Sequence, residues 1–366
     1  MTLCVFVLIA SEFMPVSLLT PLAADLGVTE GLAGQGIAIS GALAVLTSLF
    51  LSRLAGNMNR KHLLLGMTIL MALSGLIIAF AQNYQTYMTG RALIGIAIGG
   101  FWSMSAATAI RLVPHHQVTR ALAIFNGGNA LATVVAAPLG SYLGATIGWR
   151  GAFLCLVPVV SLPNMSGRKN GASGEGVFRL FRQPVVSVGL IACSLFFMGQ
   201  FALFTYVRPF LETVTHVSAS GLSLILLAIG IAGFVGTLLV TLVLNAAFYL
   251  TLIAIPLLMA AIAGALILTG HNVWIVALLS GLWGMLATAA PTGWWAWVAR
   301  TLPEDAEAGG GLMVAVIQLA IALGSTAGGM VFDRLGWQST FALSGIVLLC
   351  AAALTFMLSR LRESAS

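Results

Sequence analysis

Apolar runs long enough to cross a lipid bilayer recur along this chain from its first residues to its last. The chain is 60% hydrophobic and only 7% charged, whereas soluble domains carry about 25% charged residues. A membrane-spanning helix needs about 20 apolar residues, so 366 residues accommodate about a dozen spans joined by short loops. The sequence therefore predicts an all-α integral membrane protein without a large soluble domain.

Turn residues and charges divide the apolar runs into two sets of six predicted spans. The first set covers residues 2–24, 31–55, 62–81, 87–112, 118–147 and 151–163, and the second covers 184–211, 218–244, 248–269, 273–299, 310–332 and 339–358. A polar, basic segment separates the sets. We therefore expect an N-terminal six-helix bundle over residues 1–163, a cytoplasmic linker over 164–183 and a C-terminal six-helix bundle over 184–366.

The basic residues lie mostly at alternate ends of the predicted spans. If the N-terminus is cytoplasmic, twelve of the sixteen Lys and Arg residues face the cytoplasm. This is the positive-inside bias of membrane proteins, and it predicts that both termini are cytoplasmic. The formal net charge of +6 follows from the same bias, so it does not indicate nucleic-acid binding. The four cysteines stand singly in apolar stretches without metal-ligand spacing, and we expect no metal site.

Glu12 is the only charged residue of the first predicted span. Placing an ionisable side chain at the middle of a bilayer costs at least ~2.5 kcal/mol, so such residues usually serve as proton relays or ion sites. The other acidic residues fall at span ends or in loops. Glu12 is therefore the predicted proton-coupling residue. The structural alternative is a neutral, hydrogen-bonded acid.

An internal repeat appears at an offset of 188 residues. The segment from Glu12 to Pro21 aligns with the segment from Gln200 to Pro209. The same offset aligns a second segment: Gly140, Gly148, Trp149 and Phe153 with Gly328, Gly336, Trp337 and Phe341. Parallel repeats of this kind build carriers whose site lies near the membrane midplane between two pseudo-symmetric halves.

Small residues mark two of the predicted spans. In the fourth span, Gly95 and Gly99 share one helix face, which lets a neighbouring helix approach closely. Arg91 precedes them, and it either snorkels to the membrane surface or biases a nearby carboxylate such as Glu12. In the fifth span, Pro138 predicts a kink. Gly128 and Gly140 of this span would admit close contacts.

These motifs resemble those of the major facilitator superfamily, in its drug:proton antiporter branch. The run from Arg91 to Gly99 resembles the fourth-helix motif of that branch, and Gly127 to Gly140 resembles its fifth-helix motif. Residues 11–21, 99–106, 111–114 and 200–209 are similar to the branch members that export purine ribonucleosides. The resemblance covers nearly the whole chain. It implies twelve helices in two six-helix bundles, a bacterial inner membrane, no cofactor and proton-coupled export of nucleosides such as inosine and guanosine.

A nucleoside needs hydrogen-bonding groups for its ribose and base edges, and aromatic faces for stacking. The polar and aromatic candidates within predicted spans are Asn126, Asn129, Gln200, Gln318, Phe101, Trp102, Phe201, Phe204 and Trp283. Each could instead serve helix packing. Trp294, Trp295 and Trp297 lie near the cytoplasmic end of their span, where we expect an aromatic belt.

Other functional classes are disfavoured. The chain has no Gly-x-x-x-x-Gly-Lys-Ser/Thr loop to hold the phosphates of a nucleotide, which argues against a primary pump. It shows no clustered nucleophile, base or metal ligands, so we do not expect an enzyme. A channel fits the composition alone, but the repeat favours a carrier. Sugars and drugs remain alternative substrates. The expected partners are a small solute, protons and the lipid bilayer, and we expect a monomer.

Overall fold

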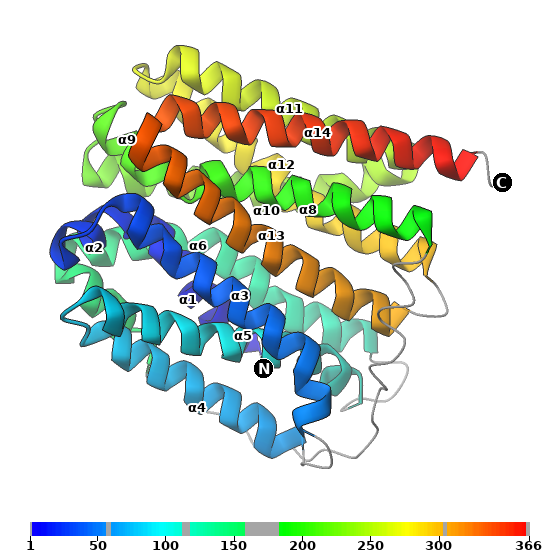
Figure 1. Cartoon of the computed structure of the whole chain (residues 1–366), viewed down its shortest axis with the longest axis horizontal. Coiled ribbons are helices and arrows are strands. Elements are labelled where there is room, and N and C mark those ends of the chain that lie inside the picture. Colours follow the sequence, from blue (N-terminus) through cyan, green and yellow to red (C-terminus); the bar gives the residue numbers. More distant parts are fainter. Residues whose placement is uncertain (1, 56–59, 112–117, 158–182, 303–305, 364–366) are drawn as a thin grey trace.

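The computed structural model describes residues 2–55, 60–111, 118–157, 183–302 and 306–363. Within these ranges every regular element is a helix, and the helices lie side by side in one bundle (Figure 1). This confirms the prediction of an all-α fold. The predicted linker lies almost wholly outside the described residues, as do residues 158–163 of the short sixth span.

The helices of the first half follow the predicted spans closely. They are α1 (Thr2–Ser17), α2 (Leu19–Leu26), α3 (Glu30–Ala55), α4 (Arg60–Ala79), α5 (Tyr84–Arg111) and α6 (Val118–Leu154). The second half contains α8 (Pro184–Phe204), α9 (Val207–Thr213), α10 (Ala219–Ala246), α11 (Phe248–Thr269), α12 (Val273–Thr301), α13 (Ala306–Leu335) and α14 (Trp337–Glu363). The uncharged junction between α10 and α11 is a single non-helical residue, Ala247.

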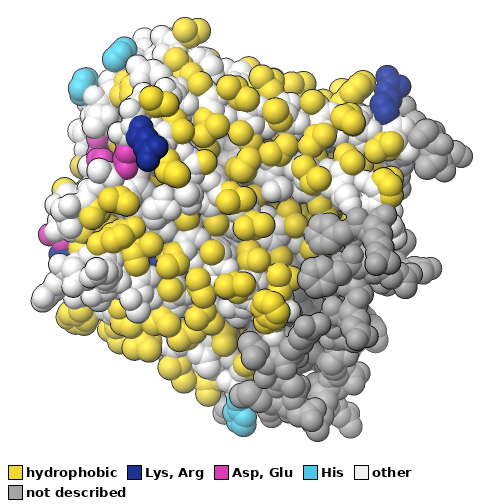
Figure 2. Space-filling model, viewed as in Figure 1, with side chains coloured by type: hydrophobic (Ala, Val, Ile, Leu, Met, Phe, Trp, Pro, Cys, Tyr) yellow, Lys and Arg dark blue, Asp and Glu magenta, His cyan; other side chains and the backbone are white. Residues whose placement is uncertain are grey.

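The outer surface of the bundle is that of a membrane protein. Among the described residues, eight helices are long and apolar enough to cross a membrane, or nine if the bent pair α1 and α2 forms one span. Large apolar side chains stand exposed along these helices, for example Phe80 and Leu268. Figure 2 shows hydrophobic side chains spread over the middle of one face, with the charged and histidine side chains toward its margins. A bilayer is the solvent that such a surface requires.

The first predicted span, expected as one helix over residues 2–24, is broken. α1 and α2 meet at Leu18 with a bend of 69°. Pro21 has no backbone N–H to offer the carbonyl of Ser17, and its ring crowds that carbonyl, which favours a break in this turn. The equivalent span of the second half is interrupted at the same place in the repeat, between α8 and α9. There Thr205 and Pro209 are the repeat partners of Ser17 and Pro21.

The 188-residue offset is also visible in the backbone. Gly148 interrupts α6 with a φ of 77°, and its repeat partner Gly336 separates α13 from α14 with a φ of 82°. Both positions need glycine because side chains disfavour this left-handed region. The aromatic pair after each glycine packs edge to face: Trp149 with Phe153, and Trp337 with Phe341. Pro138 lies within α6 without a dihedral break, which occurs only at Gly148.

The two halves contact each other through two equivalent helix pairs. α3 packs along α13, and α6 packs along α10. Small residues allow these approaches: a Cβ at Gly41 would meet the carbonyl of Gln318, and one at Gly230 would meet the backbone of Val134. Each half also has its own hydrophobic core. The interface between the halves is therefore where the predicted site residues must be sought.

Candidate functional site

Glu12 lies in α1 at the interface between the halves and is 7% exposed. Its Oε1 accepts a hydrogen bond of 3.1 Å from Nε2 of Gln318 in α13. The predicted proton-coupling acid of the first half thus binds a predicted substrate-binding amide of the second half. A buried carboxylate needs such a partner, because an isolated buried charge is costly.

Arg91 is completely buried in α5, which rules out snorkelling to the membrane surface. Its guanidinium donates to the carbonyl of Ser11 at 2.8 Å, to the carbonyl of Gly36 at 3.0 Å and to Oγ of Ser40 at 3.0 Å. These bonds join α5 to α1 and α3. Arg91 therefore holds the backbone residue directly before Glu12, and no ion pair between Arg91 and Glu12 is present in the described part of the chain.

The glycines of the fourth span make the close contacts that the sequence predicted. Gly95 lies against the backbone of Ser40, and Gly99 lies against the backbone of Ala44, both in α3. Gly140 of α6 lies against the side chains of Ser17 and Met14 in α1. These contacts pack α5 closely against α3, and α6 closely against α1, the helix that carries Glu12. The surroundings of Gly128 lie outside the described residues.

Of the three other predicted amides, Gln200, Asn126 and Asn129, only the side chain of Gln200 lies among the described residues. Gln200 in α8, the repeat partner of Glu12, has a buried Oε1 without a hydrogen-bond partner. A buried, unpaired amide oxygen costs free energy, and a bound solute that donates a hydrogen bond would relieve that cost. The side chains of Asn126 and Asn129 lie outside the described residues.

Three aromatic rings cluster on residues that follow Glu12 and Gln200 closely in the sequence. Phe13 of α1 stacks on Phe201 of α8 with ring centroids 6.0 Å apart, and Phe201 packs edge to face on Phe204 at 6.2 Å. Phe13 was not among the predicted binding residues. The signal for it was present, since the repeat aligns Phe13 with Phe201.

Phe101, Trp102 and Trp283 lie in or against two separate cores. Phe101 is 4% exposed within the first core, and Trp102 packs against that core. Trp283 is 2% exposed within the second core, where its indole N–H is buried without a partner.

The predicted aromatic belt at the end of α12 is wrong for two of its three tryptophans. Trp294 and Trp297 are 2% and 0% exposed, and their rings meet edge to face at 5.9 Å. Trp297 lies against Gly189 of α8, where the missing side chain leaves room for the indole. Only Trp295 points outward, with 42% exposure.

The halves are joined at one end of the bundle, which holds Gly27, Thr215 and Gly336 and which we call the outer end. In this region the Asp333 carboxylate accepts from Oγ1 of Thr29 at 2.6 Å and from the backbone N–H of Gly31 at 3.0 Å. Deeper along the same helix pair, Oγ1 of Thr326 donates to Oε1 of Gln35 at 3.0 Å. At the opposite end, many side chains lie outside the described residues.

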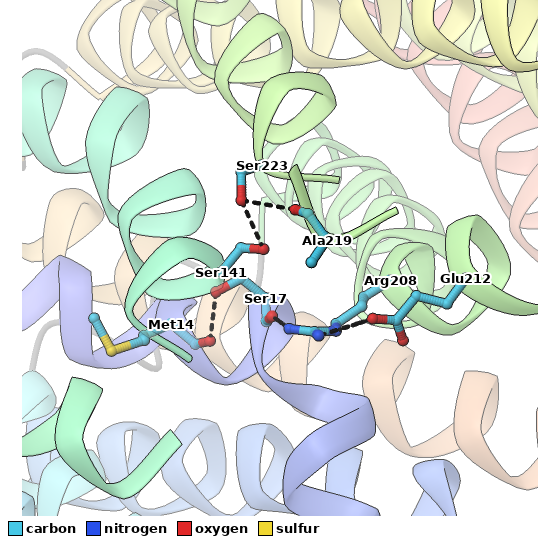
Figure 3. A network of polar contacts seen from close by, with 7 residues as sticks. All are labelled: Met14, Ser17, Ser141, Arg208, Glu212, Ala219 and Ser223. Atoms are coloured by element: carbon cyan, nitrogen blue, oxygen red, sulfur yellow. Dashed lines mark hydrogen bonds and ion pairs between the residues drawn. The ribbon is translucent and has the colours of Figure 1, made fainter. Parts of the chain in front are cut away.

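Arg208 of α9 forms a second connection at the outer end (Figure 3). It is 8% exposed, donates to the carbonyl of Ser17 where α1 breaks, and pairs with Glu212 at 2.8 Å. Ser223 of α10 donates to Ser141 of α6 at 3.0 Å nearby. Both helix-pair interfaces are therefore closed by polar contacts at this end.

Apolar helices in two related sets, with a buried acid held between the sets, define a multi-pass membrane transporter. The chain belongs to the Major Facilitator Superfamily, whose family model matches residues 1–308. Two crystal structures of a bacterial homolog of the human lysosomal transporter Spinster, inward-facing unoccupied and inward-facing occupied, have TM-scores of 0.76 and 0.79. Each covers 98% of this chain and 95% of its own, with 14% sequence identity. This likeness establishes the fold.

Curated relatives cover nearly the whole chain. The purine ribonucleoside efflux pump NepI of Salmonella typhimurium is 41% identical over 358 residues, covering 95% of this chain and 90% of its own length. A Pseudomonas aeruginosa protein named Transcription regulatory protein OpdE is 63% identical, covering 99% of this chain and 93% of its own length. The resemblance seen in the sequence motifs is thereby confirmed.

Proposed function

We propose that this protein exports purine ribonucleosides, such as inosine and guanosine, across a bacterial inner membrane in exchange for protons. The observation that carries the proposal is the buried contact between Glu12 and Gln318 at the interface of the halves. Proton and solute move in opposite directions if both compete for one site that is exposed alternately to the two sides. Glu12 supplies that site, and its single carboxylate corresponds to one proton per cycle.

The residues around Glu12 suit a small polar solute. Gln200 offers an unpaired amide oxygen, and Gln318 offers an amide that now binds Glu12. Phe13, Phe201 and Phe204 supply ring faces for a purine base. The efflux pumps at 41% identity favour a purine ribonucleoside over the alternatives, which are sugars and drugs.

We assign residues 1–163 to an N-terminal bundle and residues 184–366 to a C-terminal bundle, joined by a cytoplasmic linker. Both termini are cytoplasmic in this proposal, and the outer end of the bundle faces the periplasm. Because one chain supplies both halves of the pathway, the transporting unit is a monomer.

The relative at 63% identity carries the name of a transcription regulator, which favours a second candidate function. A transporter can change transcription by setting the intracellular concentration of an inducer. Under this proposal a regulatory effect depends on transport. An effect on transcription that persists in a transport-dead Glu12→Gln strain would separate the two functions.

Purified protein in liposomes tests the transport proposal directly. Vesicles with an acidic interior should accumulate labelled inosine, because protons leaving the vesicle drive solute inward. Labelled arabinose and an amphipathic drug, assayed on the same preparation, decide between the substrate classes. Counterflow with preloaded inosine distinguishes a carrier from an open pore, since only a carrier is accelerated by solute on the opposite side.

Glu12→Gln is the decisive variant, because glutamine keeps the shape of the side chain and cannot titrate. We expect it to abolish accumulation driven by the pH gradient, while the thermal melting curve of the solubilised variant shows that the protein remains folded. A Glu12→Gln protein that still builds an inosine gradient from a pH gradient would remove Glu12 from the proton pathway.

A further inference from the structure

Gln318 occupies the point where three helices of the two halves meet. Its side chain binds Glu12 of α1, and its carbonyl lies against Gly41 of α3. We infer that Gln318 is a positioning residue that holds the deprotonated, substrate-free carrier closed at its outer end. This inference rests on the proposed proton coupling at Glu12 and adds to it a device against proton leak.

The contact exists on one side of the pseudo-symmetry only. At the 188-residue offset, the partner of Glu12 is Gln200 and the partner of Gln318 is Ala130. An alanine side chain cannot donate a hydrogen bond, and Oε1 of Gln200 is indeed buried without a partner. Helix packing alone therefore does not require an amide at position 318.

The strength of the contact depends on the proton. With Glu12 ionised, the amide of Gln318 donates to a full negative charge, and such bonds are roughly twice as strong as neutral ones. With Glu12 protonated, one carboxyl oxygen becomes a donor and the charge is lost. The ionised acid thus joins α1 to α13 more tightly than the neutral acid does.

This difference acts on the step at which an antiporter can leak. After Glu12 releases its proton to the cytoplasm, return of the empty carrier to the outward-open state would complete a proton uniport cycle. The Glu12–Gln318 bond, together with the contacts at the outer end, opposes that return. A solute that donates a hydrogen bond to Glu12 displaces Gln318, so the carrier opens outward only when it is loaded.

The test is proton leak in liposomes that contain no substrate, followed with an entrapped pH dye under a pH gradient. Gln318→Leu should raise the leak about tenfold, the factor that corresponds to losing one charge-assisted hydrogen bond from the closed state. Gln318→Met, which has nearly the same length and no donor, should leak equally. Adding Glu12→Gln to either variant should stop the leak, because no proton can then be carried.

Gln35→Leu is the matched control. It removes another hydrogen bond between the halves, from Thr326, along the same helix pair and away from Glu12. Because the bond from Thr326 is neutral and does not depend on the proton of Glu12, Gln35→Leu should raise the leak less than either Gln318 variant does. The inference is overturned if the Gln318 variants melt like wild type and leak no more than it does, or if Gln35→Leu leaks as much as they do. If wild type itself shows no proton-coupled transport, the proposed function fails instead.

Discussion

Arg208 provides the sharpest test of how the outer end stays closed. Pro21 cannot donate to the carbonyl of Ser17, so that carbonyl has no partner within its own helix. Arg208 supplies the missing donor from the other half, and Glu212 holds the guanidinium through an ion pair of 2.8 Å. We expect Arg208→Met to favour the outward-open state, because opening lets water satisfy the carbonyl of Ser17.

The size of the effect follows from the bonds that are lost. A hydrogen bond from a charged donor contributes about 1.5–3 kcal/mol. If the bond exists only in the closed state, its loss shifts the ratio of open to closed protein about 10- to 100-fold. The buried Oε2 of Glu212 has no hydrogen-bond partner, so removing Arg208 also leaves this carboxylate uncompensated in the closed state. The free-energy cost of this uncompensated carboxylate also favours the open state.

Distance measurements between spin labels read out the opening. Ala24 in α2 and Ser220 in α10 are exposed and lie on opposite halves at the outer end. Each is replaced by cysteine for labelling, in a protein from which the four native cysteines have been removed. Arg208→Met should lengthen the label distance in a larger fraction of molecules. Arg150→Met is the control, since Arg150 binds Asp25 and the carbonyl of Ala81 within the first half. If the label distances are unchanged in Arg208→Met, or shift equally in both variants, Arg208 does not keep the outer end closed.

Two further predictions concern packing and binding. Gly99→Leu should lower the thermal stability of the solubilised protein by about 1–3 kcal/mol or prevent folding, because Ala44 leaves no room, whereas Gly66→Leu should be tolerated because Gly66 faces open space. Equal melting curves would contradict the close α3–α5 contact. Gln200→Ala should raise the apparent KM for inosine while the protein stays folded. Trp297→Ala should instead destabilise the protein by about 3–5 kcal/mol, because it leaves a cavity in the core. The reverse pattern, seen by counterflow and thermal unfolding, would place Trp297 at the site.

The sequence predicts those features of this protein that depend on nearby residues. Gly148 and Gly336 end their helices because of their own backbone conformation, and the spacing of apolar runs fixes the spans. Local signals of this kind act within a few turns of helix.

The features that escaped prediction depend on residues far apart in the chain. Trp297 looks like a belt residue from its place near a helix end, yet it is buried because Gly189 of α8 leaves room for it. The donors of Arg91 go to carbonyl oxygens of α1 and α3, whose pairing with a residue of α5 no local pattern shows, and the predicted influence of its charge on Glu12 stays a prediction. Gln318 stands 306 residues from Glu12, so no local pattern could pair the two.

The repeat explains why the residues that break it matter most. Pseudo-symmetry gives both halves the same helix breaks, glycine turns and packing pairs, and a symmetric carrier would respond alike to events at either half. Among the positions at which the halves differ on their interface are Glu12 against Gln200, Gln318 against Ala130, and Arg208 against Thr20. Each of these differences places a charge or an amide on one side only, and together the three residues form two bonds across the interface. Repeated sequence therefore builds the moving scaffold, and departures from the repeat connect a single titratable group to its movement.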